Sequence, residues 1–115
     1  MKFLESVTNE FLILRACALF MFLFSVYLIY FVFSNPNMDY LVWKSFFEGL
    51  VVKTFSTLFL ISFAVHTWLG TWAIGSDYFT PARLGGFSKI VYVSYRFICF
   101  LIVFIVFIWS LVIIW

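Results

Sequence analysis

Three long apolar segments constrain the fold of this chain more than any other feature of its sequence. They cover about residues 11–33, 50–74 and 90–115. Each is long enough to cross a bilayer as an α-helix, which takes roughly 20 apolar residues. A lipid-exposed strand with free edges would leave backbone N–H and C=O groups unpaired, at a cost of several kcal/mol for each group. The sequence therefore predicts an all-α membrane protein with three transmembrane helices.

The composition excludes several other classes of protein. Hydrophobic residues make up 66% of the 115 residues and charged residues only 10%, which is too few to cover the surface of a soluble domain. The net charge of +2 and the lack of a basic run argue against nucleic acid as a partner. Cys17 and Cys99 lie far apart inside apolar runs without CxxC spacing, so they predict neither a metal site nor a disulfide.

The segments outside the three spans predict one compact domain over residues 1–115. Glu5 and Glu10 precede the first apolar run, and no small-residue cleavage site follows it. We therefore expect a retained helix and not a cleaved signal peptide. Residues 34–49 contain amphipathic material suited to a short interfacial helix. The Gly and Pro residues of segment 75–89 predict a loop that begins where the second span ends, at Gly75.

The basic residues predict an orientation in the membrane, because positive charge collects on the cytoplasmic side. The side that holds the N-terminus and the second connection collects five basic residues: Lys2, Arg15, Arg83, Lys89 and Arg96. The other side collects two, Lys44 and Lys53. We therefore expect the N-terminus inside and the C-terminus on the opposite side of the membrane.

Charged side chains inside a span are costly and usually face protein, water or a cofactor. Arg15 lies about one turn inside the first span. Its stem either lies in lipid with its head at the interface, or its cation points inward at an anionic group. Lys53 and Arg96 are expected to reach the interface in the same way, with a partner or a lipid headgroup as the alternative for Arg96.

His66 is the only histidine and lies about two turns from the inner end of the second span, roughly 12 Å at 1.5 Å per residue. Ser62, His66 and Gly70 are four residues apart and share one helix face. Small residues on either side of an imidazole leave a groove that suits a flat haem, with the imidazole as axial ligand. The same pattern also suits close helix packing or a proton-transfer role.

An aromatic and acidic segment follows His66 toward the inner boundary. Trp68 and Trp72 lie on another face of the same helix and are suited to interfacial anchoring. Asp77 and Tyr78 are expected just past the end of the helix, at the membrane surface. A tyrosine hydroxyl can donate to a carbonyl there, and a nearby carboxylate can orient it or carry protons. Interfacial anchoring is the more common role for such a tyrosine.

The spacing of these residues resembles one family, the hydrophobic membrane anchor subunits of succinate dehydrogenase. The first span adds to the resemblance through the string FLILRACA at residues 11–18, which places an Arg at position 15. Chain length, three spans and the inward N-terminus also agree with the family. The motif itself reads His66-x-Trp68-x-Gly70-x-Trp72-x4-Asp77-Tyr78.

The resemblance implies a subunit of respiratory complex II in a bacterial inner membrane, with a cytoplasmic N-terminus and a periplasmic C-terminus. Its partners would be a second membrane anchor subunit that shares its helical bundle, an iron–sulfur subunit and a flavoprotein subunit. His66 would be one axial ligand of a b-type haem iron, with the other ligand from the second anchor, and Arg15 would face a haem propionate. Tyr78 would hydrogen-bond ubiquinone, and Asp77 would support it. No complete active site lies in this chain on that interpretation.

Three other functions compete with this interpretation. A fumarate reductase-type anchor would run the reaction in the opposite net direction. A small haem-free proton-transfer protein would use His66 as its titrating group. A haem-free assembly subunit would use Arg15 and His66 only for hydrogen bonds between helices. Arg83 and Lys89 could contact either soluble subunits or anionic lipid.

Overall fold

The computed structural model describes residues 2–115, apart from the side chains of residues 3 and 4, and contains helices but no strand over that range. The elements in chain order are α1 (Lys2–Ser34), α2 (Tyr40–Glu48), α3 (Leu50–Tyr78), α4 (Pro81–Leu84), the 3-10 turn η1 (Gly85–Phe87) and α5 (Ser88–Ile114). The described part of the chain contains three helices that are long and apolar enough to cross a membrane: Glu5–Ser34, Leu50–Tyr78 and Pro81–Ile114. The predicted all-α fold with three such helices is confirmed.

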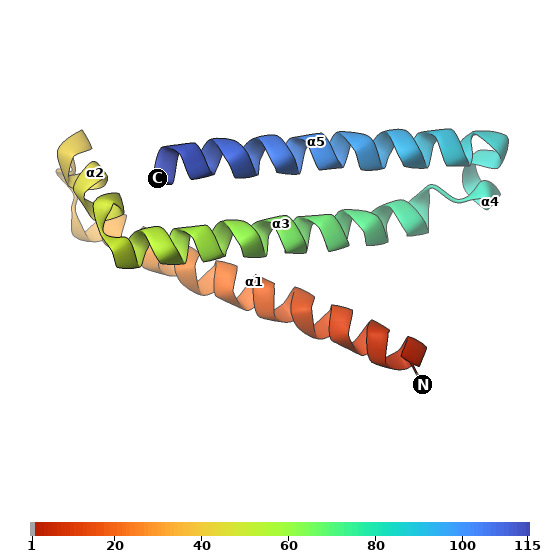
Figure 1. Ribbon diagram of the computed structural model, residues 1–115, viewed down its shortest axis with the longest axis horizontal. Helices are drawn as coiled ribbons and strands as arrows, with labels where there is room; N and C mark the ends of the chain where they lie inside the picture. The colour runs from red at the N-terminus through yellow and green to blue at the C-terminus, as the bar shows by residue number, and fades with distance from the viewer. Residues whose placement is uncertain (1) are drawn as a thin grey trace.

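α3 is the central helix of the molecule and packs against both α1 and α5 (Figure 1). It runs antiparallel to both neighbours, and the N-terminal half of α1 diverges from it. The N-terminus and α4 lie toward one end of the long axis, while α2 and the C-terminus lie toward the other. The molecule is elongated, with extents of 56 × 32 × 23 Å.

The short helix α2 folds across one end of the bundle. Its first turn is capped by Asp39, whose carboxylate accepts a hydrogen bond of 2.9 Å from the backbone N–H of Val42. The Phe46 ring stacks on Phe31 of α1 with 3.8 Å between the ring centroids. The expected short helix within residues 34–49 is therefore present, and an aromatic contact holds it against α1.

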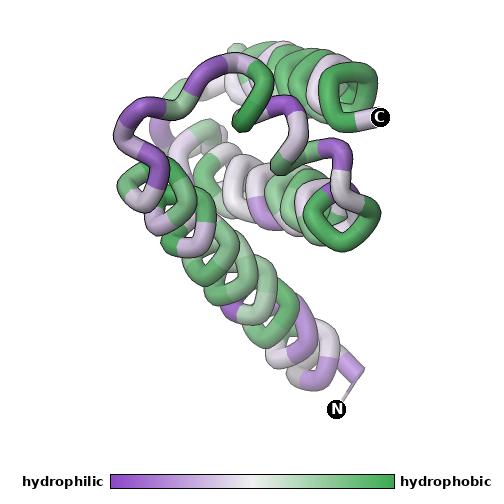
Figure 2. The backbone as a smooth tube through the Cα atoms, turned by 90° about the vertical axis from the view of Figure 1, so that its left-hand side faces the viewer, coloured by the Kyte–Doolittle hydropathy of each residue, from purple (hydrophilic) through white to green (hydrophobic). Residues whose placement is uncertain are grey.

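Very little of the apolar surface is buried within the chain. Phe24 and Leu60 are the buried hydrophobic residues of the described part, and Ser56 and Ser88 are its buried polar residues. The most apolar windows of the three long helices are only 6%, 11% and 0% buried. Figure 2 shows hydrophobic residues along the long helices, and hydrophilic residues mainly near the N-terminus and in the connections. The long helices therefore present their apolar faces outward, as a multi-pass membrane protein requires.

The helix boundaries differ from the sequence-based expectation in one way that affects the site. α3 does not end at Gly75 but continues to Tyr78, so Asp77 and Tyr78 belong to its last turn. Gly75 serves helix packing: a Cβ atom built on it would lie 2.9 Å from Cε1 of Tyr95 and 3.1 Å from Cε2 of Tyr92. The expected loop 75–89 is also largely helical, since α5 already begins at Ser88.

Candidate functional site

His66 lies on α3 where this helix contacts α1. Its ring nitrogen Nδ1 is 3.4 Å from the backbone carbonyl oxygen of Leu14, and the side chain is half-buried. A carbonyl oxygen can only accept, so this contact requires the proton on Nδ1. In the neutral imidazole the other nitrogen, Nε2, then carries the free lone pair. The geometry leaves His66 able to act as a ligand through Nε2.

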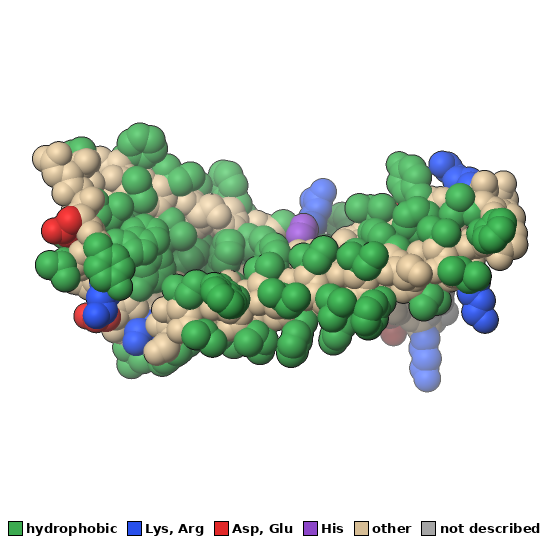
Figure 3. All heavy atoms as spheres, turned by 90° about the horizontal axis from the view of Figure 1, so that it is seen from above, with side chains coloured by type: hydrophobic (Ala, Val, Ile, Leu, Met, Phe, Trp, Pro, Cys, Tyr) green, Lys and Arg blue, Asp and Glu red, His purple; other side chains and the backbone are tan. Residues whose placement is uncertain are grey.

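The face of α3 that carries His66 is not covered by other described residues beside Gly70. Gly70 lies one helical turn beyond His66 on the same face, and a Cβ atom built on it would meet no atom within 4 Å. Ser62, one turn before His66, is half-buried. Figure 3 shows the histidine at the molecular surface near the middle of the long axis. The residues present therefore fit a bulky flat group or a partner helix beside the imidazole.

Arg15 lies at the same level of the bundle as His66, because Leu14, the residue before it, supplies the carbonyl that faces the imidazole. Its side chain is exposed, and its guanidinium carbon lies 4.8 Å from the centre of the Phe11 ring. The ion pair in the described part of the chain joins Lys44 to Glu48 within α2 and does not involve Arg15. The guanidinium of Arg15 therefore has no carboxylate partner among the described residues and remains available to an external anion.

Asp77 and Tyr78 form a second location, separate from His66. Both are exposed on the last turn of α3, about 18 Å from His66 along the helix axis at 1.5 Å per residue. Arg83 of α4 places its guanidinium carbon 5.1 Å from the centre of the Tyr78 ring. The structure thus brings Arg15 and His66 to one level and leaves the Asp-Tyr pair at the end of the bundle that holds α4.

Arg83 was not predicted to contact Tyr78. A cation over an aromatic ring is attracted by the electron-rich ring face. This contact depends on the reversal of the chain through α4, so no spacing along one helix indicates it. The Arg83 guanidinium contacts the Tyr78 ring, and the Tyr78 hydroxyl makes no hydrogen bond to the described residues.

Arg96 of α5 contacts residues of α3 that its place in the sequence does not identify. Its guanidinium donates to the carbonyl oxygen of Trp68 at 3.2 Å and to Oγ1 of Thr71 at 3.0 Å, and its Cζ lies 3.6 Å from the centre of the Trp68 ring. Next to it, the Tyr95 hydroxyl donates to the carbonyl oxygen of Thr71 at 3.0 Å. These contacts join α5 to α3 between the levels of His66 and Tyr78. Arg96 thus has a partner, which was the alternative expected for it, and this partner belongs to the same chain.

No protein-family model matches the chain. Among curated proteins, the chain is similar to the succinate dehydrogenase hydrophobic membrane anchor subunit of Coxiella burnetii. The two sequences are 30% identical over 78 residues, which cover 66% of this chain and 68% of that protein.

Proposed function

The chain belongs to the family of succinate dehydrogenase hydrophobic membrane anchor subunits, and on this premise we propose that it helps bind a b-type haem and ubiquinone in respiratory complex II. It contributes to the passage of electrons from succinate oxidation to the quinone. Its partners in that complex are a second anchor subunit, an iron–sulfur subunit and a flavoprotein subunit. The complex lies in a bacterial inner membrane, and the N-terminus of this chain is cytoplasmic.

The contact between His66 and Leu14 is the observation that carries the haem proposal. Histidine ligands of metals usually donate their other ring N–H to a carbonyl or carboxylate, which fixes the tautomer and the ring orientation. The 3.4 Å approach of Nδ1 to the Leu14 carbonyl oxygen has this arrangement. Haem iron supplies one-electron chemistry when it is bound, with an axial imidazole as a common ligand. The second axial ligand comes from the other anchor subunit.

Arg15 is proposed to bind a haem propionate. A guanidinium is well suited to a carboxylate because its planar N–H groups can donate two parallel hydrogen bonds. Arg15 is at the level of His66, is exposed, and has no carboxylate partner in the described chain. A haem liganded by His66 would need a cation of this kind, because its propionates carry negative charge into a region of low dielectric constant.

Tyr78 is proposed to donate a hydrogen bond to a carbonyl oxygen of ubiquinone. The residue is exposed, and the guanidinium of Arg83 lies over its ring. Reduction of a quinone to a quinol takes two electrons and two protons, so the site needs access both to an electron carrier and to water. Asp77 is the adjacent exposed carboxylate and can orient the tyrosine or pass protons to it.

The haem proposal is tested by His66→Ala in the complete purified complex. We expect the reduced-minus-oxidised b-type haem signal to be lost or strongly reduced, since an alanine provides no ligand. Ile61→Ala is the control, because it shortens an exposed apolar side chain about one turn earlier on α3. Subunit stoichiometry on a gel confirms that both variants assemble. Unchanged haem content and spectrum in an assembled His66→Ala complex would contradict the proposal.

A further inference from the structure

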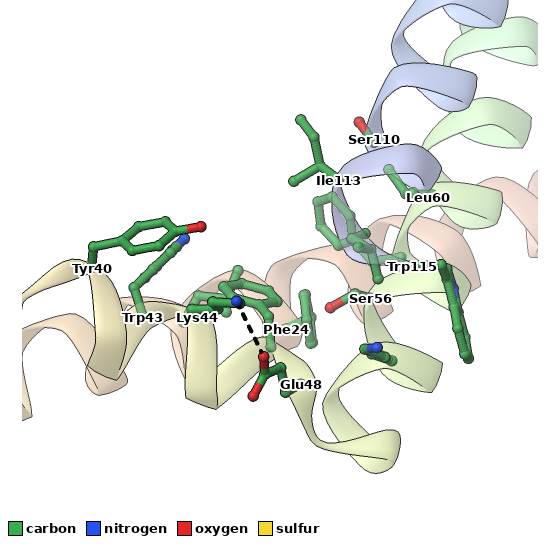
Figure 4. Close-up of a pocket in the computed structure, with 15 residues that line it drawn as sticks. Phe24, Tyr40, Trp43, Lys44, Glu48, Ser56, Leu60, Ser110, Ile113 and Trp115 are labelled. Carbon is green, nitrogen blue, oxygen red and sulfur yellow. Dashed lines mark ion pairs between the residues drawn. The ribbon is translucent and has the colours of Figure 1, made fainter.

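A cavity of about 500 Å³ lies at the other end of the bundle, between α2, the first turns of α3 and the last turns of α5 (Figure 4). Its walls are mostly apolar and include Phe24, Phe47, Leu60 and Ile113. Ser56 also lines it and is ten residues from His66, or about 15 Å along α3. The cavity is therefore separate from the residues proposed to bind haem and quinone.

The Ser56 hydroxyl is an unsatisfied polar group in this wall. The residue is 3% exposed, and its Oγ has no hydrogen-bond partner among the residues that the structure describes. Nearby threonines on the same helix behave differently, since Thr54 and Thr57 each donate to the carbonyl four residues earlier, at 2.8 Å. In Figure 4 the Ser56 oxygen is directed away from its own helix toward the space beside Phe24. A buried hydroxyl without a partner is costly, so the cavity offers a donor to an external acceptor.

The mouth of the cavity is basic. Lys53 lies about one turn before Ser56, nearer the start of α3, and its Nζ is 5.3 Å from the centre of the Trp115 ring. Trp115 is itself fixed by a 2.9 Å hydrogen bond from Nε1 to Oγ1 of Thr57. Lys44 also lines the cavity but is paired with Glu48, with 3.7 Å between Nζ and Oε1. Lys53 therefore provides the uncompensated positive charge at the mouth.

These groups follow an order along the bundle. Along α3, Lys53 comes first and Ser56 follows about 4.5 Å further from the end of the bundle at 1.5 Å per residue, and the rest of the lining is mostly apolar. A glycerophospholipid has the same order of phosphate, ester carbonyl and acyl chain. A protein helix about 10–12 Å across would fill 500 Å³ with a single turn, so the cavity is too small for a partner's helix.

We propose that this cavity binds one glycerophospholipid from the adjacent leaflet. Its phosphate pairs with Lys53, an ester carbonyl accepts a hydrogen bond from Ser56, and an acyl chain occupies the space lined by Phe24, Leu60 and Ile113. The net positive mouth favours an anionic headgroup such as phosphatidylglycerol. The bound lipid contacts α2, α3 and α5 at this end of the bundle, where the cavity otherwise separates these helices.

Photolabelling of the assembled complex tests the proposal. The complex is reconstituted in phosphatidylcholine nanodiscs with a small fraction of phosphatidylglycerol that carries a photoreactive acyl chain. We expect cross-links at Phe24, Leu60 or Ile113 and their loss on dilution with unlabelled phosphatidylglycerol. Ser56→Ala and Lys53→Gln should each weaken the labelling about five-fold, the effect of one hydrogen bond or one interfacial charge. Thr54→Val is the control for Ser56→Ala, because its exposed hydroxyl bonds its own helix.

Two results would overturn the proposal. One is labelling at the cavity residues no stronger than at Phe33, a lipid-exposed residue of α1. The other is displacement of the labelled lipid by long-chain ubiquinone but not by unlabelled phosphatidylglycerol. Haem content and quinone reductase activity are measured on the same samples. Both should be unchanged in Ser56→Ala, which separates this test from that of the haem and quinone sites.

Discussion

Tyr78 is 57% exposed, although its ring lies beneath the Arg83 guanidinium. An interfacial anchor needs only the amphipathic ring, whereas a quinone ligand needs the hydroxyl as a donor. A phenylalanine at position 78 keeps the ring but lacks the hydroxyl, so it removes the ability to donate to a quinone and leaves the ring for anchoring.

We predict that Tyr78→Phe lowers succinate:ubiquinone reductase activity by about 10-fold or more, as loss of one hydrogen bond made to the reacting group would. Succinate oxidation with an artificial acceptor should be unchanged, because it bypasses the quinone. Tyr30→Phe, at an exposed position near the other end of the bundle, is the control. Equal turnover with ubiquinone in the wild-type and Tyr78→Phe complexes would remove Tyr78 from the quinone site.

The residues of the candidate site differ in how well the sequence predicts them. His66 and Arg15 are conspicuous because ionisable side chains are rare in apolar segments, whereas Asp77 stands out only through its place beside Tyr78 just after the second apolar segment. The partner of His66 could not be found in this way, since it is the main-chain oxygen of Leu14. The contact of Arg83 with Tyr78 and the identity of the residues that Arg96 contacts were not predictable, because they depend on how three helices pack and not on spacing within one helix.

At the scale of elements, the existence of the three spans was predictable from apolar length, but the end of α3 was not. Glycine is a poor helix former and often ends a helix, which made Gly75 a reasonable boundary. The structure keeps Gly75 helical, with the rings of Tyr92 and Tyr95 against its backbone. Close packing at this position needs the absence of a side chain, and that need arises only when α5 is in place.

Gly75→Ala is expected to destabilise the contact between α3 and α5 by about 1–3 kcal/mol, the usual range for an overpacked site. The new Cβ would lie 2.9 Å from Tyr95, whose ring is held by the hydrogen bond from its hydroxyl to Thr71. Thermal denaturation of the purified complex measures the effect. Gly86→Ala is the control, since a Cβ there meets no atom within 4 Å, and an equal melting temperature for the two variants would contradict the prediction.

Arg96 and Thr71 provide a second test of the same helix pair. We predict a coupling free energy of about 0.5–3 kcal/mol in a double-mutant cycle of Arg96→Leu and Thr71→Val, measured by denaturation of the complex. The guanidinium donates to Thr71 Oγ1 at 3.0 Å, so removal of either group should weaken the effect of removing the other. An Arg96 side chain that reaches only the interface would instead give additive effects and a coupling near zero.

At the scale of the whole molecule, the two ends of the bundle differ in the number of basic residues assigned to them. The N-terminus and α4 lie toward the same end, and the basic residues predicted for that side include Lys2, Arg83 and Lys89 (Figure 1). Most charged side chains lie toward the ends of the long axis, with apolar side chains between them (Figure 3). The positive-inside rule applied to this arrangement predicts a cytoplasmic N-terminus.

Single cysteines test this orientation. In a background with Cys17→Ala and Cys99→Ala, we expect Asn37→Cys to react with a membrane-impermeant maleimide added outside spheroplasts. Ala82→Cys should react only after permeabilisation. Both positions are exposed. Asn37 lies in the connection before α3 and Ala82 in the connection after it, at opposite ends of that helix. The reverse labelling pattern would place the N-terminus on the periplasmic side.

The use of a main-chain oxygen to hold His66 affects how much mutation the site can tolerate. Every residue type presents the same carbonyl, so Leu14 could become Ile, Met or Phe and the imidazole would keep its partner. A saturation mutagenesis scan of α1 should therefore find position 14 permissive to apolar residues, even though its backbone contacts the site. The geometry around the imidazole can thus persist in relatives whose first helix has diverged beyond recognition.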